Sequence, residues 1–251
     1  MIELLRPNPE VRRQGVPDDP LKVLYVRSYL WLRLAIGLLG LALPIVLSLS
    51  DSFLSRDWRL RGSISGYYYS GARDTLVGTM TAIAVFLVAY KVAEENLDNI
   101  LSLAAGLLAG LMALFPTGRP EDDIPLTPLQ SRLGESVVEG LHYVAGAAFL
   151  VCLARLCWIF GTVEGKRPAK PGKRTPTFWR RFHHGCAATI VVGIGLCLAS
   201  VLTDWPALFW PEVLCVWAFG VSWTMKGAEM DILKTRVGAE ASAETSSRHG
   251  S

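Results

Sequence analysis

The sequence predicts an all-α fold: a polytopic membrane protein built as a bundle of six transmembrane helices. Hydrophobic residues make up 51% of the 251 residues, mean hydropathy is +0.34, and charged residues are only 19%, against about 25% in soluble domains. The apolar residues are also gathered in separate stretches. A helix needs about 20 mostly apolar residues to cross a bilayer. Six stretches approach that length: 29–50, 75–92, 97–115, 137–160, 184–202 and 208–225.

Each stretch is predicted to be a helix, because an unpaired peptide group in lipid costs several kcal/mol. A soluble helical bundle is the alternative, but a chain of this size can hardly bury several helices that are apolar on every side. The first stretch begins after 28 residues and is long enough to span, so we interpret it as a signal anchor. The predicted organisation is a cytoplasmic segment 1–28, a transmembrane domain 29–226 and a polar, disordered cytoplasmic tail 227–251.

The distribution of Lys and Arg sets the predicted orientation. Five precede the first stretch, one follows the second, seven follow the fourth and four follow the sixth, whereas the alternate connections carry six in all. Cytoplasmic loops are rich in Lys and Arg, so both termini are predicted to lie in the cytoplasm. Arg33 and Arg155 fall inside stretches near their cytoplasmic ends, where they are expected to reach the headgroups.

The connection 161–183 is the most basic part of the chain. Its first half is expected to be an irregular linker, and residues 178–181 (FWRR) an interfacial anchor. We expect this connection to bind anionic lipid headgroups, at about 1 kcal/mol per cation, and not nucleic acid. Gly106 and Gly110 form a G-x-x-x-G in the third stretch, which favours close helix packing within the bundle or, alternatively, a homo-oligomer contact.

Three acidic residues are expected to share the non-cytoplasmic surface. Asp74, Glu139 and Glu212 begin the second, fourth and sixth stretches, where a helix N-terminus favours a carboxylate. Simple capping of three helices is one interpretation. His142 is three residues after Glu139 and therefore on the same helix face. An ionisable side chain inside a span suggests function, although a hydrogen-bonded packing histidine is the alternative.

The segment 61–74, RGSISGYYYSGARD, delivers its polar residues to the same surface. Its three tyrosines suit the aromatic belt of a membrane interface, and Arg73 is placed to pair with Glu139 or a lipid phosphate. We therefore predict a ligand-binding set at this end of the bundle. Its members are Ser63, Ser65, Tyr67, Tyr68, Tyr69, Arg73, Asp74, Thr117, Glu139, His142 and Glu212.

A catalytic interpretation uses Ser65 as nucleophile, His142 as base and Asp74 as the orienting acid, with Glu139 as a further candidate. The run G-S-I-S-G differs from the G-x-S-x-G nucleophile elbow, because Ile64 holds the central place. It also lacks the glycine two residues before the serine that rhomboid-type proteases have. A single histidine supplies too few nitrogen or sulfur ligands for a zinc site. The five cysteines all lie inside the predicted transmembrane stretches. No metal, cofactor or disulfide framework is predicted.

The connection 116–136 carries four prolines and an acidic patch at 121–123. It is expected to be a loop over the mouth of the bundle. The patch could suit calcium, but solvated surface charge is the favoured interpretation.

The motif SISGYYYSGARD, the FPT at 115–117 and the LH at 141–142 resemble a shared pattern of uncharacterised bacterial six-span membrane proteins. That pattern is S-x-S-x-Y-Y-Y-x-G-x-R-D, then Phe-Pro-Thr, then Leu-His, and WAFGVSW at 217–223 is similar to a further part of it. The resemblance covers most of the spans. It implies a bacterial inner-membrane location and brings no activity.

A fainter similarity is to the ceramidase and adiponectin-receptor superfamily of membrane hydrolases, which use Ser, Asp and three His. This chain has no H-x-x-x-H in a late stretch and only one histidine on the non-cytoplasmic side. The leading functional prediction is therefore a non-enzymatic membrane protein, a sensor or accessory subunit. It would bind a lipid headgroup or small molecule in an outward-facing polar pocket. A membrane-embedded hydrolase is the alternative. A transporter is disfavoured, because charges in mid-membrane are scarce.

Overall fold

The computed structural model describes residues 20–56, 58–90, 97–169, 174–203 and 208–226. All regular structure in these ranges is helical, which confirms the all-α fold class. The predicted tail 227–251 and residues 1–19 of the predicted N-terminal segment lie outside the described residues, whereas residues 20–28 of that segment belong to the first helix. The elements are α1 (Pro20–Ser55), the 3₁₀ helix η2 (Ser65–Tyr69), α2 (Arg73–Ala89), α3 (Leu97–Leu114), α4 (Pro128–Leu133), α5 (Glu135–Gly165), α6 (Pro176–Leu202) and a last helix, 209–226.

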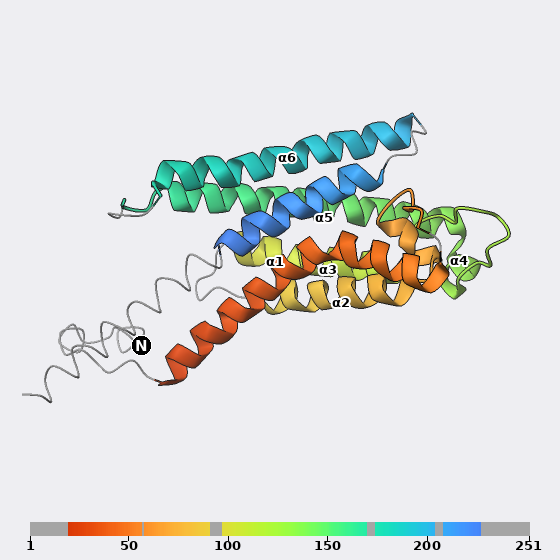
Figure 1. Cartoon of the computed structure of the whole chain (residues 1–251), viewed down its shortest axis with the longest axis horizontal. Coiled ribbons are helices and arrows are strands. Elements are labelled where there is room, and N and C mark those ends of the chain that lie inside the picture. Colours follow the sequence, from red (N-terminus) through yellow and green to blue (C-terminus); the bar gives the residue numbers. More distant parts are fainter. Residues whose placement is uncertain (1–19, 57, 91–96, 170–173, 204–207, 227–251) are drawn as a thin grey trace, which may run out of the picture.

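The long helices lie side by side and run in alternate directions, so the described ends, residues 20 and 226, lie at the same end of the bundle (Figure 1). Four helical segments are long and apolar enough to cross a membrane: Leu30–Ser55, Leu97–Leu114, Glu135–Gly165 and Pro176–Leu202. They indicate a multi-pass membrane protein. The remaining two, α2 and the last helix, match predicted stretches but are shorter or less apolar, so six crossings remain a prediction.

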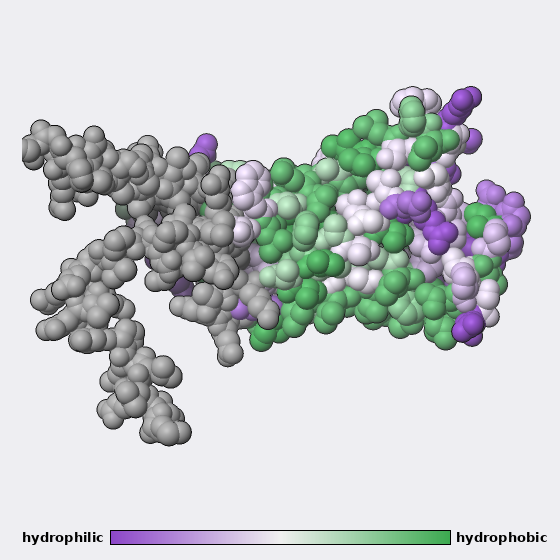
Figure 2. Space-filling model, turned by 90° about the horizontal axis from the view of Figure 1, so that it is seen from below, coloured by the Kyte–Doolittle hydropathy of each residue, from purple (hydrophilic) through white to green (hydrophobic). Residues whose placement is uncertain are grey.

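The surface of the bundle is largely apolar along its length. Figure 2 shows a hydrophobic band over the middle of the visible face and hydrophilic residues gathered at one end. Exposed side chains along this length include Leu107 on α3, Val144 on α5 and Val191 on α6, at 59%, 70% and 60% exposure. Such a continuous exposed apolar surface suits lipid as the surrounding solvent.

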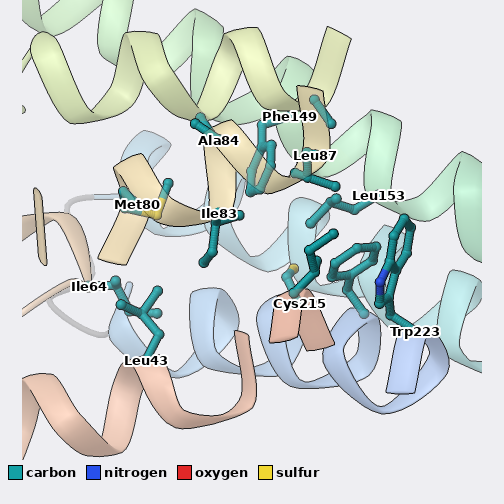
Figure 3. Close-up of a cluster of buried hydrophobic side chains, with 14 of the residues drawn as sticks. Leu43, Ile64, Met80, Ile83, Ala84, Leu87, Phe149, Leu153, Cys215 and Trp223 are labelled. Atoms are coloured by element: carbon teal, nitrogen blue, oxygen red, sulfur yellow. The ribbon is translucent and has the colours of Figure 1, made fainter. Parts of the chain in front are cut away.

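Small residues let the helices pack closely. A Cβ on Gly106 would lie 2.8 Å from the carbonyl oxygen of Ala84 on α2, so this glycine is used inside the bundle. A Cβ on Gly37 of α1 would lie 3.2 Å from the carbonyl oxygen of Gly220 in the last helix. Between the helices, Figure 3 shows apolar side chains of α2 meeting Phe149 and Leu153 of α5, with Trp223 beside them.

Two sequence-based expectations need correction. Arg33 is only 2% exposed and faces the bundle interior, so it does not reach the headgroups, whereas Arg155 is exposed. The interfacial anchor at 178–181 stays a prediction; its residues belong to the start of α6, where Thr175 accepts a hydrogen bond from Phe178 N. The loop over the mouth contains α4, which begins with a capping box between Thr127 and Gln130.

Candidate functional site

The 3₁₀ helix η2 sits at the end of the bundle opposite residues 20 and 226, and Asp51 at the end of α1 holds the chain around it. The Asp51 side chain is 1% exposed. Its carboxylate accepts hydrogen bonds from Ser55 Oγ at 2.7 Å, Arg61 Nε at 2.7 Å and Gly71 N at 3.1 Å. Both ends of the segment 61–71 are therefore fixed to one buried acid. Asp51 is not among the predicted site residues, although a carboxylate directly after the predicted span 29–50 is a signal of function.

Ser65, the first residue of η2, is hydrogen-bonded to His142 of α5, with 2.9 Å between Ser65 Oγ and His142 Nε2. His142 Nδ1 lies 2.7 Å from the carbonyl oxygen of Phe115. A carbonyl can only accept, so Nδ1 carries the proton, and in the neutral ring Nε2 accepts from the serine hydroxyl. His142 is 6% exposed. The structure thus brings together the predicted nucleophile and the predicted base.

The three predicted acids behave differently. Glu212 Oε2 accepts a hydrogen bond of 2.5 Å from Ile64 N, so this carboxylate caps the start of η2 from the last helix. Glu139 packs against Gly118, where a Cβ would collide with its carboxylate. Asp74 is exposed in the first turn of α2 and makes no hydrogen bond or ion pair within the described ranges. The orienting group at His142 is therefore the Phe115 carbonyl and not Asp74.

The predicted interfacial tyrosines instead fix η2 to the bundle. Tyr67 is 0% exposed, and its hydroxyl lies 3.1 Å from Ser48 Oγ on α1. Tyr68 is also buried, and it accepts a 2.7 Å hydrogen bond from Arg73 Nη2. Arg73 also lies over the Tyr68 ring, with Cζ 4.4 Å from the ring centre, so it does not form the predicted pair with Glu139.

Tyr69 connects η2 to the loop above it. Its hydroxyl donates to the Thr117 carbonyl at 2.6 Å and accepts from Gln130 Nε2 of α4 at 2.8 Å. Burial raises the pKa of the Tyr69 phenol above its usual value, so the hydroxyl stays a donor at neutral pH. Thr117 Oγ1 lies 3.4 Å from the Tyr143 hydroxyl, and Ser63 Oγ accepts from Gly66 N at 2.8 Å. Gln130 is not among the predicted site residues, although Thr127, Pro128 and Gln130 form the T-P-x-Q signature of a helix start and could have predicted α4.

Arg119 orders the acidic part of the same loop. Its guanidinium makes a bidentate pair with Glu135 at 3.0 and 2.8 Å, and it donates to the carbonyl oxygens of Asp122 and Ile124 at 2.9 and 2.6 Å. The Asp122 side chain is fully exposed to solvent, which suits the interpretation of the acidic patch as solvated surface charge. Over the described ranges, no group of three or more His, Cys, Asp or Glu is placed to hold a metal ion.

A small cavity of about 30 Å³ lies between η2, α2, α3 and α5. One water needs about 10–15 Å³ by the same measure, so the cavity has room for roughly two waters. Three polar side chains contribute hydroxyl or imidazole groups to the wall: Ser65, Thr117 and His142. The rest of the wall is aromatic or apolar: Ile64, Tyr68, Leu76, Met80, Met112 and Pro116. Because Ser65 donates to His142 and His142 donates to Phe115, Ser65 Oγ is left as a hydrogen-bond acceptor beside the Thr117 hydroxyl. A polar headgroup with a donor, such as a hydroxyl, that continues into an apolar chain matches this lining.

Backbone donors near Ser65 are already used. Ile64 N donates to Glu212, and Gly66 N donates to Ser63 Oγ. An oxyanion hole needs free donors close to the nucleophile, so the arrangement as it stands serves binding better than acyl transfer. Comparisons with protein-family models, with curated proteins and with solved structures find no match to this chain.

Proposed function

We propose that this chain is a six-span integral membrane protein with both termini in the cytoplasm, and that its non-cytoplasmic end binds an amphiphile beneath η2. The ligand's polar headgroup would meet Ser65, His142 and Thr117, and its apolar part would enter between Met80, Met112 and Leu76. The single observation that carries this proposal is the mixed lining of the cavity. The role is that of a sensor or accessory subunit.

Two features support a cavity that enlarges for such a ligand. Methionine side chains are unbranched and flexible, so they re-pack easily around an inserted chain. Met112 is half-buried, and its Cε would lie 3.5 Å from a Cβ placed on Gly146, so space for movement exists beside it. The polar wall of the cavity is fixed by hydrogen bonds that involve Asp51, Glu212 and the tyrosines of η2. Its hydrogen-bonding side chains therefore stay in place when the apolar wall moves.

Filling the cavity tests this proposal. Met112→Phe is expected to reduce the amount of one co-purifying lipid species by about tenfold or more, because a ring in the cavity costs the ligand at least about 1.4 kcal/mol of binding. The measurement is mass spectrometry of lipids extracted from the full chain purified in mild detergent. Met225→Phe, at the exposed far end of the last helix, is the matched control. Equal lipid content in both variants would contradict the proposal.

A serine hydrolase is the second candidate, because the Ser65–His142–Phe115 arrangement is that of a nucleophile, its base and the group that orients the base. Ser65 Oγ would attack an ester carbonyl while its proton passes to His142 Nε2. The alcohol would leave with that proton, and water would then release the acid from the acyl-serine. Oxyanion donors would have to become free on substrate binding, which is a condition that the binding proposal does not need.

Covalent labelling separates the two candidates. If Ser65 is an activated nucleophile, a fluorophosphonate probe labels the wild-type chain in membranes. Labelling is then lost in Ser65→Ala and reduced by about 10²-fold or more in His142→Gln, which removes the base. Ser63→Ala, two residues away, keeps it. A wild-type chain that stays unlabelled while it retains its lipid would exclude the hydrolase and leave the binding proposal intact.

A further inference from the structure

A second polar cluster lies at the opposite, predicted cytoplasmic, end of the bundle, around Arg33 of α1. Arg33 is 2% exposed. Its Nη1 donates to the Tyr90 hydroxyl at 3.0 Å. Its Cζ lies 4.9 Å from the ring centre of Phe160 and 5.1 Å from that of Trp223. These aromatic faces attract the cation, but they supply no hydrogen-bond acceptor in the plane of the guanidinium.

One edge of this guanidinium is open. Both Nε and Nη2 are buried and have no hydrogen-bond partner among the described residues. These two nitrogens lie on the same edge of the planar group, whereas Nη1, which holds Tyr90, lies on the other side. Two parallel N–H donors in this geometry match the two oxygens of a carboxylate or a phosphate. Leaving such donors unpaired in the interior costs several kcal/mol.

Two further buried nitrogens without partners belong to the same cluster, in which the Trp223 ring centre lies 5.1 Å from Arg33 Cζ. Trp223 Nε1 and His183 Nε2 are both buried and unpartnered in the described structure, while His183 Nδ1 is hydrogen-bonded to Ser222 Oγ at 2.8 Å. The Phe160 ring packs against both residues: its centre lies 5.3 Å from that of Trp223 and 6.0 Å from that of His183. Indole and guanidinium nitrogens only donate. The cluster is therefore rich in donors and short of acceptors.

The described acids nearby do not hydrogen-bond to the open edge of Arg33. Glu164 contacts Lys226 through Oε1 and Arg167 through Oε2, at 3.2 Å for the latter. Asp98 of α3 interacts electrostatically with Arg33 and with Lys226, but no hydrogen bond joins it to the guanidinium. No carboxylate of the described residues therefore supplies an acceptor to the open edge of Arg33.

We propose that Arg33, Trp223 and His183 form a binding site for an oxyanion with two adjacent oxygens, a carboxylate or a phosphate group, within the cytoplasmic half of the bundle. Arg33 receives the two oxygens through Nε and Nη2, and the indole N–H of Trp223 donates to one of them. The His183 tautomer with a proton on Nε2 adds a further donor. The anion arrives either as a free solute or as the headgroup of a lipid, and both share this chemistry.

Ligand-dependent stability tests this site. The full chain in neutral detergent is titrated with inorganic phosphate, acetate and chloride at constant ionic strength, and heat unfolding is followed by tryptophan fluorescence. Phosphate or acetate is expected to raise the midpoint saturably, since a ligand that binds only the native state stabilises it, whereas chloride, with no pair of oxygens, is not. Nanodiscs containing phosphatidic acid, compared with phosphatidylcholine alone, distinguish a lipid source from a free anion.

Variants make the test specific. Trp223→Phe keeps the ring but removes the N–H, and it is expected to weaken anion binding about tenfold, as the loss of one charge-assisted hydrogen bond implies. Trp217→Phe is the matched control, because the Trp217 indole donates to the Leu41 carbonyl at 3.0 Å, away from the cluster. Arg33→Lys removes the two-donor edge and abolishes the shift. If no oxyanion raises the midpoint, or if Trp223→Phe and Trp217→Phe respond alike, the proposal is wrong.

Discussion

Glu164→Leu is expected to lower the free energy of unfolding by about 3–5 kcal/mol, the usual cost of removing one partner from a buried ion pair. Glu164 and Lys226 are 4% and 7% exposed and contact each other directly. The substitution takes away the carboxylate that Lys226 and Arg167 share, and a buried ammonium without that partner has a large desolvation penalty. The shift is measured as the fall in the midpoint of thermal unfolding in detergent.

The double variant Glu164→Leu with Lys226→Met separates charge from packing. Replacing both partners of a buried pair by apolar residues is often neutral, so most of the lost stability should return. Glu121→Gln is the control, because Glu121 lies exposed in the loop over the mouth. A double variant as unstable as Glu164→Leu alone would mean that packing at Glu164, and not the ion pair, determines the stability.

The overall architecture was predictable because the hydrophobic effect acts on long stretches. Six apolar stretches and an alternation of Lys and Arg suffice to place helix boundaries within a few residues of those observed for α2, α3 and the last helix. The largest differences are at the ends of α1, α5 and α6, which continue past the apolar stretch. The apolar composition predicts only the part of each helix that would lie in lipid. The backbone hydrogen bonds of the helix continue beyond that part, into the aqueous layer.

The candidate site was predictable only in part. Alternating helix directions place Ser65 and His142 at one end of the bundle, but contact between them depends on how η2 turns, which Asp51 and Glu212 determine through contacts distant in sequence. Asp74 and Arg73 share that end without joining the pair. Periodicity also could not show that Arg33 and Lys226 face the interior, because helices in lipid are apolar on both the outer and inner faces.

Buried charge is therefore concentrated at the two ends of the bundle. Asp51 lies at one end, paired with the partly exposed Arg61, and Arg33, Glu164 and Lys226 lie at the other. Between them the core is apolar, and small residues bring the helices close together. The two ends differ in one respect: Arg61 Nε and Gly71 N donate to Asp51, whereas Nε and Nη2 of Arg33 have no acceptor among the described residues. This difference makes the first cluster structural and the second a binding site in our proposals.

Asp51→Asn is expected to destabilise the end of the bundle that carries η2 by about 2–3 kcal/mol, the typical loss when hydrogen bonds to a buried charged group are broken. The carboxylate accepts three hydrogen bonds with its two oxygens, whereas an amide has one oxygen and an NH₂ that must face a donor. The segment 61–71 should then loosen and carry η2 and Ser65 with it. Trypsin added to the full chain in mild detergent should cleave after Arg61 faster than in the wild-type chain, and the unfolding midpoint should fall. Asp74→Asn, at an exposed position of the same surface, is the matched control and should change neither. Cleavage and midpoint that stay at wild-type values in Asp51→Asn would show that η2 is held by its tyrosines and Glu212 alone.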